Sequence, residues 1–258
     1  MLASLAPPAR AGIVLGTAGD FAVLAGSTVT NTGPSVIDGG DVGVSPGTAI
    51  TGFGGAGNGT VVAPYSLQAG TTLAAQGQTD LTTAYNAAAA LTPTQTLTGQ
   101  DLGGMTLTPG VYFFASSAQL TGTLTLDNNT NNPNAQFVFQ IGSTLTTASG
   151  SSVVMTGAGS SMLGCNVFWQ VGSSATLGTT TAFEGHILAN TSITLDTGAT
   201  ILDGSALARS GAVTLDSNTI TNCVSASSVP EPTTMTLALI GAALLGPTGI
   251  ARRLRRKS

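Results

Sequence analysis

Charged side chains are scarce in this sequence. Asp, Glu, Lys and Arg make up 7% of its 258 residues, whereas soluble domains average about 25%. Five of the seven basic residues fall within Arg252–Lys257, so the long preceding part of the chain has only Arg10 and Arg209 to set against 11 acids. No basic surface for phosphates is left there, which excludes nucleic-acid binding.

Residues for acid-base and metal chemistry are equally few. His186 is the only histidine, and no lysine precedes Lys257. General acid-base catalysis, Schiff-base formation and metal binding all depend on such side chains. The sequence therefore predicts a protein that is not an enzyme and that carries neither a cofactor nor a metal ion.

Aromatic residues account for only 5% of the chain, while glycine is abundant, with 35 residues, and threonine recurs throughout. Large interlocking aromatic cores and long charged helices are therefore not expected. Small side chains must provide most of the packing.

The C-terminal part has three consecutive elements. Val229-Pro230-Glu231-Pro232 is followed by Thr233–Ala251, which has no charged residue and is rich in Leu, Ala and Gly. As a helix this segment would reach roughly 28 Å, close to the ~30 Å hydrocarbon core of a bilayer. The basic tail, residues 252–258, comes next and is expected on the cytoplasmic side, with everything upstream outside.

This order of Pro-Glu-Pro motif, apolar segment and arginine cluster resembles the PEP-CTERM sorting signal of Gram-negative bacteria. The resemblance implies a transient membrane association, a cut near the motif by an exosortase-type sorting enzyme, and release to the cell surface. A plain tail anchor is the alternative. It leaves Gly241, Gly246, Pro247 and Gly249 unexplained, because these residues make a mediocre permanent anchor.

The N-terminus has part of an export signal. Ala9-Arg10-Ala11 fits the A-x-A cleavage pattern, but Met1–Ala6 is shorter than the usual apolar stretch of about 7 to 15 residues. We interpret residues 1–11 as the remnant of a signal peptide. A single folded domain is then expected over residues 12–224, joined to the sorting segment by a linker at 225–228.

One long helix is predicted inside that domain, over about 65–91. Pro64 and Pro93 bound the region, and apolar residues follow heptad spacing at Leu67, Ala74, Leu81 and Ala88. Gln, Thr and Asp form its polar face, so the helix would be marginal alone and must pack against another element.

From Gly103 onward the apolar pattern changes to a period of two, and short segments recur. Phe137-Val-Phe-Gln-Ile-Gly-Ser is repeated as Val167-Phe-Trp-Gln-Val-Gly-Ser, and Ile193-Thr-Leu-Asp as Val213-Thr-Leu-Asp. Successive similar segments of this length favour a solenoid whose coils donate strands to stacked parallel sheets. A β-sandwich is the alternative, but it gives no reason for the repetition.

Four stretches resemble the microbial ice-binding protein family: Leu15-Gly-Thr-Ala-Gly-Asp-Phe-Ala-Val-Leu-Ala-Gly, Leu107-Thr-Pro-Gly-Val-Tyr, Asn166-Val-Phe-Trp-Gln-Val-Gly-Ser-Ser-Ala-Thr-Leu-Gly and Ala206-Leu-Ala-Arg-Ser-Gly-Ala-Val-Thr-Leu-Asp. The resemblance implies a mostly β fold, a right-handed triangular parallel β-helix with one long α-helix packed alongside. It also implies binding to the surface of an ice crystal through one flat face.

Aligning the repeats by their inward aliphatic residues predicts two outward columns of small side chains. One contains Thr125, Thr146, Thr176, Thr194 and Thr214, and the other, two residues earlier, contains Thr123, Thr144, Ser174, Ser192 and Ala212. Parallel strands lie about 4.7 to 4.9 Å apart, and same-side residues about 6.6 to 6.8 Å apart along a strand. We interpret these columns as an ice-binding lattice, although threonine is also common at exposed strand positions.

Other polar residues favour structural roles. Cys165 and Cys223 are the only thiols, and an even count in an exported chain predicts a disulfide between them. His186 takes the repeat position of Ser205 and is expected on the surface. Glu184 and Asp203 also share a repeat position, and we expect exposed polar side chains there rather than a catalytic pair.

The sequence leaves two functions open. The first is an extracellular ice-binding protein that adsorbs to ice through a flat Thr-rich face and slows ice growth or recrystallisation. The alternative is a non-enzymatic matrix or adhesion protein of the cell surface, sorted with exopolysaccharide. A β-helical carbohydrate-active enzyme is disfavoured because the acid-base residues are missing.

Overall fold

The computed structural model describes residues 12–129, 132, 134–157 and 164–223. The chain divides into two units, residues 1–225 and 226–258. The second unit lies outside the described residues, as do the expected leader remnant at 1–11, the linker at 225–228 and the whole sorting segment at 229–258. In the part of the chain that is described, no helix is long and apolar enough to cross a membrane.

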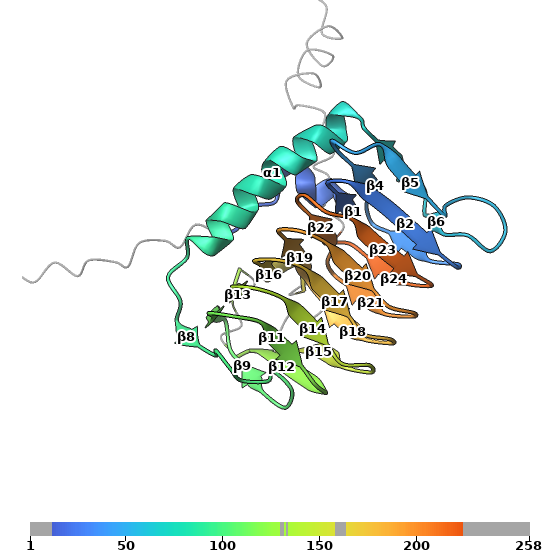
Figure 1. The fold of residues 1–258 in the computed structure, drawn as a ribbon. Coiled ribbons are helices and arrows are strands. Elements are labelled where there is room, and N and C mark those ends of the chain that lie inside the picture. Colours follow the sequence, from blue (N-terminus) through green and yellow to red (C-terminus); the bar gives the residue numbers. More distant parts are fainter. Residues whose placement is uncertain (1–11, 130–131, 133, 158–163, 224–258) are drawn as a thin grey trace, which may run out of the picture. The chain divides into compact units, whose positions relative to one another are not determined.

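The described chain is a mostly β solenoid of three parallel sheets (Figure 1). Sheet A has the order β7(Leu67–Ala69), β4(Asp41–Val44), β1(Phe21–Ala25), β22(Ala206–Ala208), β19(His186–Ala189), β16(Val167–Val171), β13(Phe137–Ile141), β10(Gly110–Phe114), β8(Gln95–Thr96). Sheet B has the order β11(Ala118–Leu120), β14(Leu145–Thr147), β17(Ala175–Leu177), β20(Ile193–Leu195), β23(Val213–Asp216), β2(Thr28–Thr32), β5(Ala49–Thr51). Sheet C has the order β6(Thr60–Val61), β3(Val36–Asp38), β24(Thr219–Thr221), β21(Thr200–Leu202), β18(Ala182–Glu184), β15(Ser152–Gly157), β12(Thr123–Asn128), β9(Thr106–Leu107).

The coils do not stack in chain order. β1, β2 and β3 of the first coil pair with β22, β23 and β24 of the last. In Figure 1 the blue N-terminal strands therefore lie beside the orange C-terminal ones, while the green coils form the opposite end. The long helix follows the N-terminal coils in the chain and connects one end of the stack to the other.

The interior is packed by residues that the parallel register places above one another. Phe139 and Trp169 come from the repeated seven-residue segment and are paired in adjacent strands. Their rings stack with centroids 3.8 Å apart and an interplanar angle of 7°. Trp169 is fully buried, and its indole nitrogen donates a hydrogen bond of 3.0 Å to the carbonyl of Glu184. Tyr112 and Phe183 extend this pair into one aromatic stack inside the solenoid.

The helix α1 spans Thr72–Ala89 and covers the outer side of sheet A. It is shorter than the expected 65–91, because residues 67–69 instead pair with β4 as a strand. The hydroxyl of Thr71 accepts a hydrogen bond of 3.2 Å from the amide of Ala74 and so caps the first turn. Both packed surfaces are apolar. The helix contributes Ala74, Leu81, Ala84, Tyr85 and Ala88, and sheet A contributes Val111, Val138, Phe168, Leu188 and Leu207.

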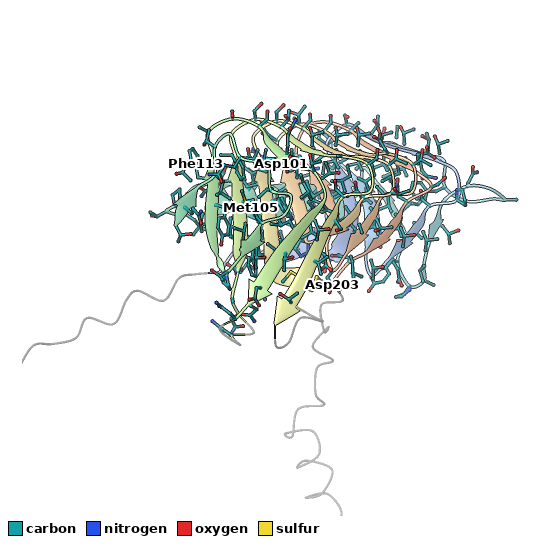
Figure 2. The ribbon with its side chains drawn as sticks, turned by 90° about the horizontal axis from the view of Figure 1, so that it is seen from below. Asp101, Met105, Phe113 and Asp203 are labelled. Atoms are coloured by element: carbon teal, nitrogen blue, oxygen red, sulfur yellow. A yellow bond between two sulfur atoms is a disulfide. The ribbon has the colours of Figure 1, made fainter. Side chains whose placement is uncertain are left out.

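Polar side chains hold the corners where the chain passes from one sheet to the next. Asp203 lies at such a corner, between β21 and β22, whereas Asp101 lies opposite Gln119 at the end of sheet B, on a different side of the molecule (Figure 2). The carboxylate of Asp101 accepts hydrogen bonds from the amides of Gly103 and Thr121, at 2.7 and 2.9 Å. The side-chain amide of Asn218 donates to the carbonyls of Asp196 and Ala199, at 2.9 Å each. Such bonds satisfy backbone groups that the strands leave unpaired.

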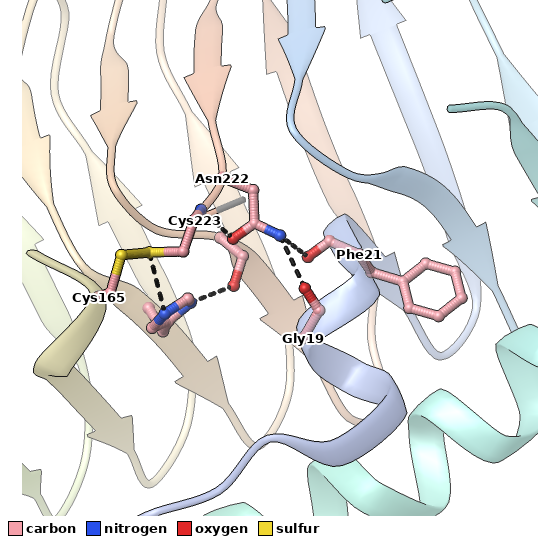
Figure 3. Close-up of a disulfide and its surroundings, with 7 residues drawn as sticks. Gly19, Phe21, Cys165, Asn222 and Cys223 are labelled. Carbon is pink, nitrogen blue, oxygen red and sulfur yellow. Dashed lines mark hydrogen bonds between the residues drawn. A yellow bond between two sulfur atoms is a disulfide. The ribbon is translucent and has the colours of Figure 1, made fainter. Parts of the chain in front are cut away.

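A disulfide links Cys165 to Cys223, with Cα atoms 5.7 Å apart (Figure 3). It joins the 3₁₀ turn η3(Gly164–Asn166) to the end of the last described coil. The neighbouring residue Asn222 donates to the carbonyls of Gly19 and Phe21, at 2.9 and 3.2 Å. The first coil, the last coil and a central coil are therefore tied together at this corner.

Candidate functional site

The outer side of sheet B has a column of polar side chains, which are threonines in every strand except β11, where Gln119 stands. The register places these residues opposite one another in consecutive strands: Gln119, Thr146, Thr176, Thr194, Thr214, Thr30 and Thr51. Thr176 lies between the buried residues Ala175 and Leu177, and Thr194 between the buried Ile193 and Leu195. Alternation of this kind turns the threonines outward while their neighbours fill the interior.

A second column lies two residues earlier along the same strands and includes Thr144, Ser174 and Ser192, with Ala212 and Thr28 continuing it. The hydroxyl of Ser192 accepts a hydrogen bond of 3.2 Å from the amide of Ala212, and that of Ser174 accepts one of 3.3 Å from the amide of Ser192. These bonds fix the side chains against the backbone of the adjacent coil. We call the two columns together the sheet B face.

Thr125 does not belong to the sheet B face, which corrects the sequence-based expectation. Thr125 lies in β12 of sheet C, where it pairs with Thr106 and Val154. Thr123 is in the same strand and is excluded with it. The sheet B strand of that coil is β11, so Gln119 takes the place that had been expected for Thr125. The error arose because a pattern of an aliphatic residue followed by Thr-Leu-Asp occurs on both sheets, at Leu124 on sheet C and at Ile193 and Val213 on sheet B.

Thr30 and Thr51 are members of the column that the sequence analysis missed. Both come from the two coils near the N-terminus, which continue the face beyond Thr214. Thr28-Val29-Thr30 has the same alternation as the later strands and is a local signal for an outward threonine. Its position beside the last coil depends on pairing between distant segments, which a repeat alignment does not show.

The other two faces of the solenoid differ in character from the sheet B face. Sheet A is covered by α1. The outer side of sheet C has large apolar side chains, with Val154 41% and Leu202 49% exposed, and the half-buried acid Glu184 opposite Leu202. In the named strands of sheet B, the two columns contain neither charged nor aromatic residues; beyond β11, Asp101 lies opposite Gln119 at the end of the sheet. Asp196 and Asp216 follow at the strand ends, where Asp216 accepts a hydrogen bond from Thr197.

His186 is buried rather than exposed, with 3% of its surface accessible. Its repeat position matches Ser205, and its Nδ1 atom lies 2.8 Å from the hydroxyl of that residue. Its Nε2 atom lies 3.7 Å from the Sγ atom of Cys223, and Ile13, Leu15 and Gly19 line the adjoining pocket. These residues come from parts of the chain that the repeat does not include. Burial lowers the pKa of His186 to about 4, so the imidazole is neutral.

Glu184 and Asp203 are half-buried, where exposed side chains had been expected. The turn η3 packs against them, since a side chain at Gly164 would meet Asp203 and Glu184 within 2.7 Å. Burial, together with the negative charge of Asp203, raises the pKa of Glu184 to about 7. Among the residues that the structure describes, no group of three or more His, Cys, Asp or Glu is placed to hold a metal ion.

Comparison with known proteins decides the family. Residues 23–221 match the ice-binding-like protein family. The chain belongs to this family. An ice-binding protein of Nostoc sp. (strain HG1) is 55% identical, over 95% of this chain and 88% of the relative. One from Colwellia sp. is 34% identical, over 81% of this chain and 83% of the relative.

Solved structures of ice-binding proteins share the fold of this family member. One from an Antarctic biological consortium has a TM-score of 0.75 and 46% identity, covering 86% of this chain and 96% of that one. A second, from the Antarctic ascomycete Antarctomyces psychrotrophicus, has a TM-score of 0.74 and 42% identity, covering 82% and 98%. Residues 228–256 match the PEP-CTERM protein-sorting motif.

Proposed function

We propose that this protein binds ice and that the sheet B face is the surface that contacts the crystal. The observation that carries the proposal is the register of Thr146, Thr176, Thr194, Thr214 and Thr30, which lie opposite one another in five adjacent strands. Strand spacing in one direction and residue spacing in the other arrange the hydroxyl and methyl groups in two dimensions. Repeats of that scale also occur in ice.

The chemistry of the sheet B face suits adsorption to ordered water. Threonine has a stiff χ1 angle, so little side-chain entropy remains to be lost on binding. The methyl groups are apolar while the hydroxyls can join a hydrogen-bonded layer of water. Charged side chains would hold hydration shells of another geometry, and the strands from β14 to β5 have none in the two columns. Relatives that are named ice-binding proteins support the same conclusion.

Ice-crystal shaping by variants tests this function. Thr176→Tyr and Thr194→Lys place a bulky or charged side chain at the centre of the sheet B face, and we expect both to abolish shaping. Thr219→Tyr is the matched control, because Thr219 is exposed on sheet C one strand after Thr214. Shaping that persists in both sheet B variants would place the ice-binding surface elsewhere, and an inactive wild-type protein would favour the matrix role.

We further propose that the protein is exported and has no catalytic activity. The match to the PEP-CTERM motif supports sorting by an exosortase-type enzyme, with transient association of residues 233–251 with the inner membrane. Val229-Pro230-Glu231-Pro232 is the proposed recognition motif. Cleavage near this motif would release the ice-binding domain outside the cell or at the cell surface, where ice forms.

A further inference from the structure

A groove of about 420 Å³ separates the middle of α1 from the corner between sheets A and B. Ser45 and Pro46 line it where the chain leaves β4, Arg209 where the chain leaves β22, and Gln78, Thr79, Thr82 and Thr83 from the helix. Its volume is within the range of small-molecule sites, about 300–1,000 Å³. None of the threonines of the sheet B face lines this groove.

Arg209 is the only arginine or lysine among the described residues, and none of the described carboxylates pairs with it. Its guanidinium carbon lies 4.5 Å from the centre of the Tyr85 ring. Nη1 donates to Asn190 at 2.8 Å, and Nε donates to the Thr82 hydroxyl at 3.4 Å. A guanidinium has five N–H groups. Arg209 is therefore held in place by neutral partners, with donors left for an anion.

The threonines of α1 present hydrogen-bond acceptors to the groove. The hydroxyls of Thr79, Thr82 and Thr83 each donate their proton to a helix carbonyl four residues earlier, at 3.1, 3.0 and 3.2 Å. These hydroxyl oxygens can therefore act only as acceptors, and that of Thr82 already accepts from Arg209, which leaves those of Thr79 and Thr83. Across the groove, Ser45 is 8% exposed, and its hydroxyl bonds to none of the described residues.

The groove thus combines a fixed cation, Arg209, with hydrogen-bond acceptors on α1. We infer that it binds a hydroxylated carboxylate of the sugar-acid class. The carboxylate accepts from the planar guanidinium of Arg209, a geometry in which two parallel bonds can form. The hydroxyls of the sugar donate to Thr79 and Thr83, and Ser45 can accept or donate. A sulfate ion would satisfy Arg209 but would have no proton for the threonine oxygens. A neutral sugar would leave the charge of Arg209 without a partner.

Titration of the full-length chain with three probes tests the inference. We expect sodium glucuronate to bind saturably and to shift the NMR signals of residues lining the groove. Glucose should give no saturable shift, and sulfate should bind at least tenfold more weakly than glucuronate. Glucuronate that binds no better than glucose, or that shifts only signals outside the groove, overturns the proposal.

Two variants separate binding from structural support. Arg209→Gln removes the charge, and we expect at least a tenfold loss in affinity for glucuronate. Because Arg209 also contacts α1, Thr83→Val provides a second test in which an exposed hydroxyl is replaced by a methyl group. It should weaken glucuronate binding while leaving sulfate binding unchanged, and Thr219→Val on sheet C should change neither. Equal glucuronate affinity in Thr83→Val and wild type would overturn the sugar-acid assignment. Ice-crystal shaping should persist in both groove variants, so the outcome is independent of ice binding.

Discussion

Thr30 of the first coil lies directly opposite Thr214 of the last coil in the parallel register of sheet B. The outward threonine column therefore crosses from the C-terminal strands into the N-terminal ones without a break. Thr51 in β5 continues it by one further strand. The length of the sheet B face thus depends on an arrangement of coils that differs from their order in the chain.

A substitution in the first coil should consequently be as harmful to ice binding as one in the last. We expect Thr30→Tyr to abolish crystal shaping, because its side chain would stand above the face beside Thr214. The free energy of unfolding should change by no more than about 0.5 kcal/mol, since the position is exposed. Thr125→Tyr on sheet C is the control variant, and it should still shape ice crystals. If Thr125→Tyr were the inactive variant, sheet C would be the ice-binding surface.

Loss of the disulfide should destabilise the domain. Cys165 and Cys223 close a loop with a sequence separation of 58, and a loop of that length stabilises the folded state by roughly 3 to 5 kcal/mol on the chain-entropy model. For a domain of this size, we expect the Tm of the double alanine variant to be about 10 °C lower than that of the wild type. Thermal unfolding followed by circular dichroism measures this. An unchanged Tm would show that the backbone contacts at this corner are sufficient alone.

Stability should depend on pH through His186. Its pKa falls from 6.5 in the unfolded chain to about 4 in the folded one, so the unfolded state binds more protons between these values. The stabilising contribution is complete above pH 6.5 and is lost as the pH falls toward 4, by about 3 kcal/mol at most. His186→Gln should remove this acid sensitivity, as shown by urea unfolding at pH 7 and pH 4.5. An equal change in the free energy of unfolding between pH 7 and pH 4.5 in the wild type and in the variant would contradict this prediction.

Glu184 should act in the opposite direction. Its pKa is raised from 4.5 to about 7 by burial and by Asp203, so the folded state binds more protons in that window. Its contribution to stability is present below pH 4.5 and is lost as the pH rises through 7. We expect Glu184→Gln to be more stable than the wild type at pH 8, with the difference shrinking at pH 5. A constant difference at both pH values would argue against the raised pKa.

The C-terminal segment should act as a removable sorting signal. Glu231→Gln, or deletion of residues 252–258, is expected to leave unprocessed protein in the inner membrane, because the recognition motif or the cytoplasmic charge is missing. Mass spectrometry of the protein recovered from native cells measures the cut. Mature protein that still contains Thr233–Ala251 would identify the segment as a lasting anchor.

Sequence patterns predicted those parts of the structure that depend on local alternation. Thr176, Thr194 and Thr214 follow buried aliphatic residues at regular intervals, and their register is as expected. Thr125 was assigned wrongly because its neighbours alternate in the same manner on sheet C. The residues in and beside a strand do not indicate which of the three sheets that strand joins.

The remaining differences come from contacts between distant parts of the chain. His186 has the repeat position that was inferred for it, but Cys223 contacts it there, and residues near the N-terminus line the adjoining pocket. Leu67 fits the helical spacing of Leu81, yet it lies in β7 because the edge of β4 is available to pair with it. In both cases a partner far away in the sequence decides between two conformations that the local pattern allows equally.

The closure of the first coil on the last also constrains how the protein can fold. β1, β2 and β3 each have one strand edge that is filled only by β22, β23 and β24, and contacts between such distant segments form slowly. During synthesis or export these edges stay open until residues 206–221 have emerged, and open edges promote aggregation. A chain that lacks its last coil would leave six unpaired edges in the middle of the stack, three on β1–β3 and three on β19–β21. We therefore expect the domain to tolerate deletion of β8 and β9, which lie at the ends of their sheets and each pair with one strand, far better than loss of β22–β24.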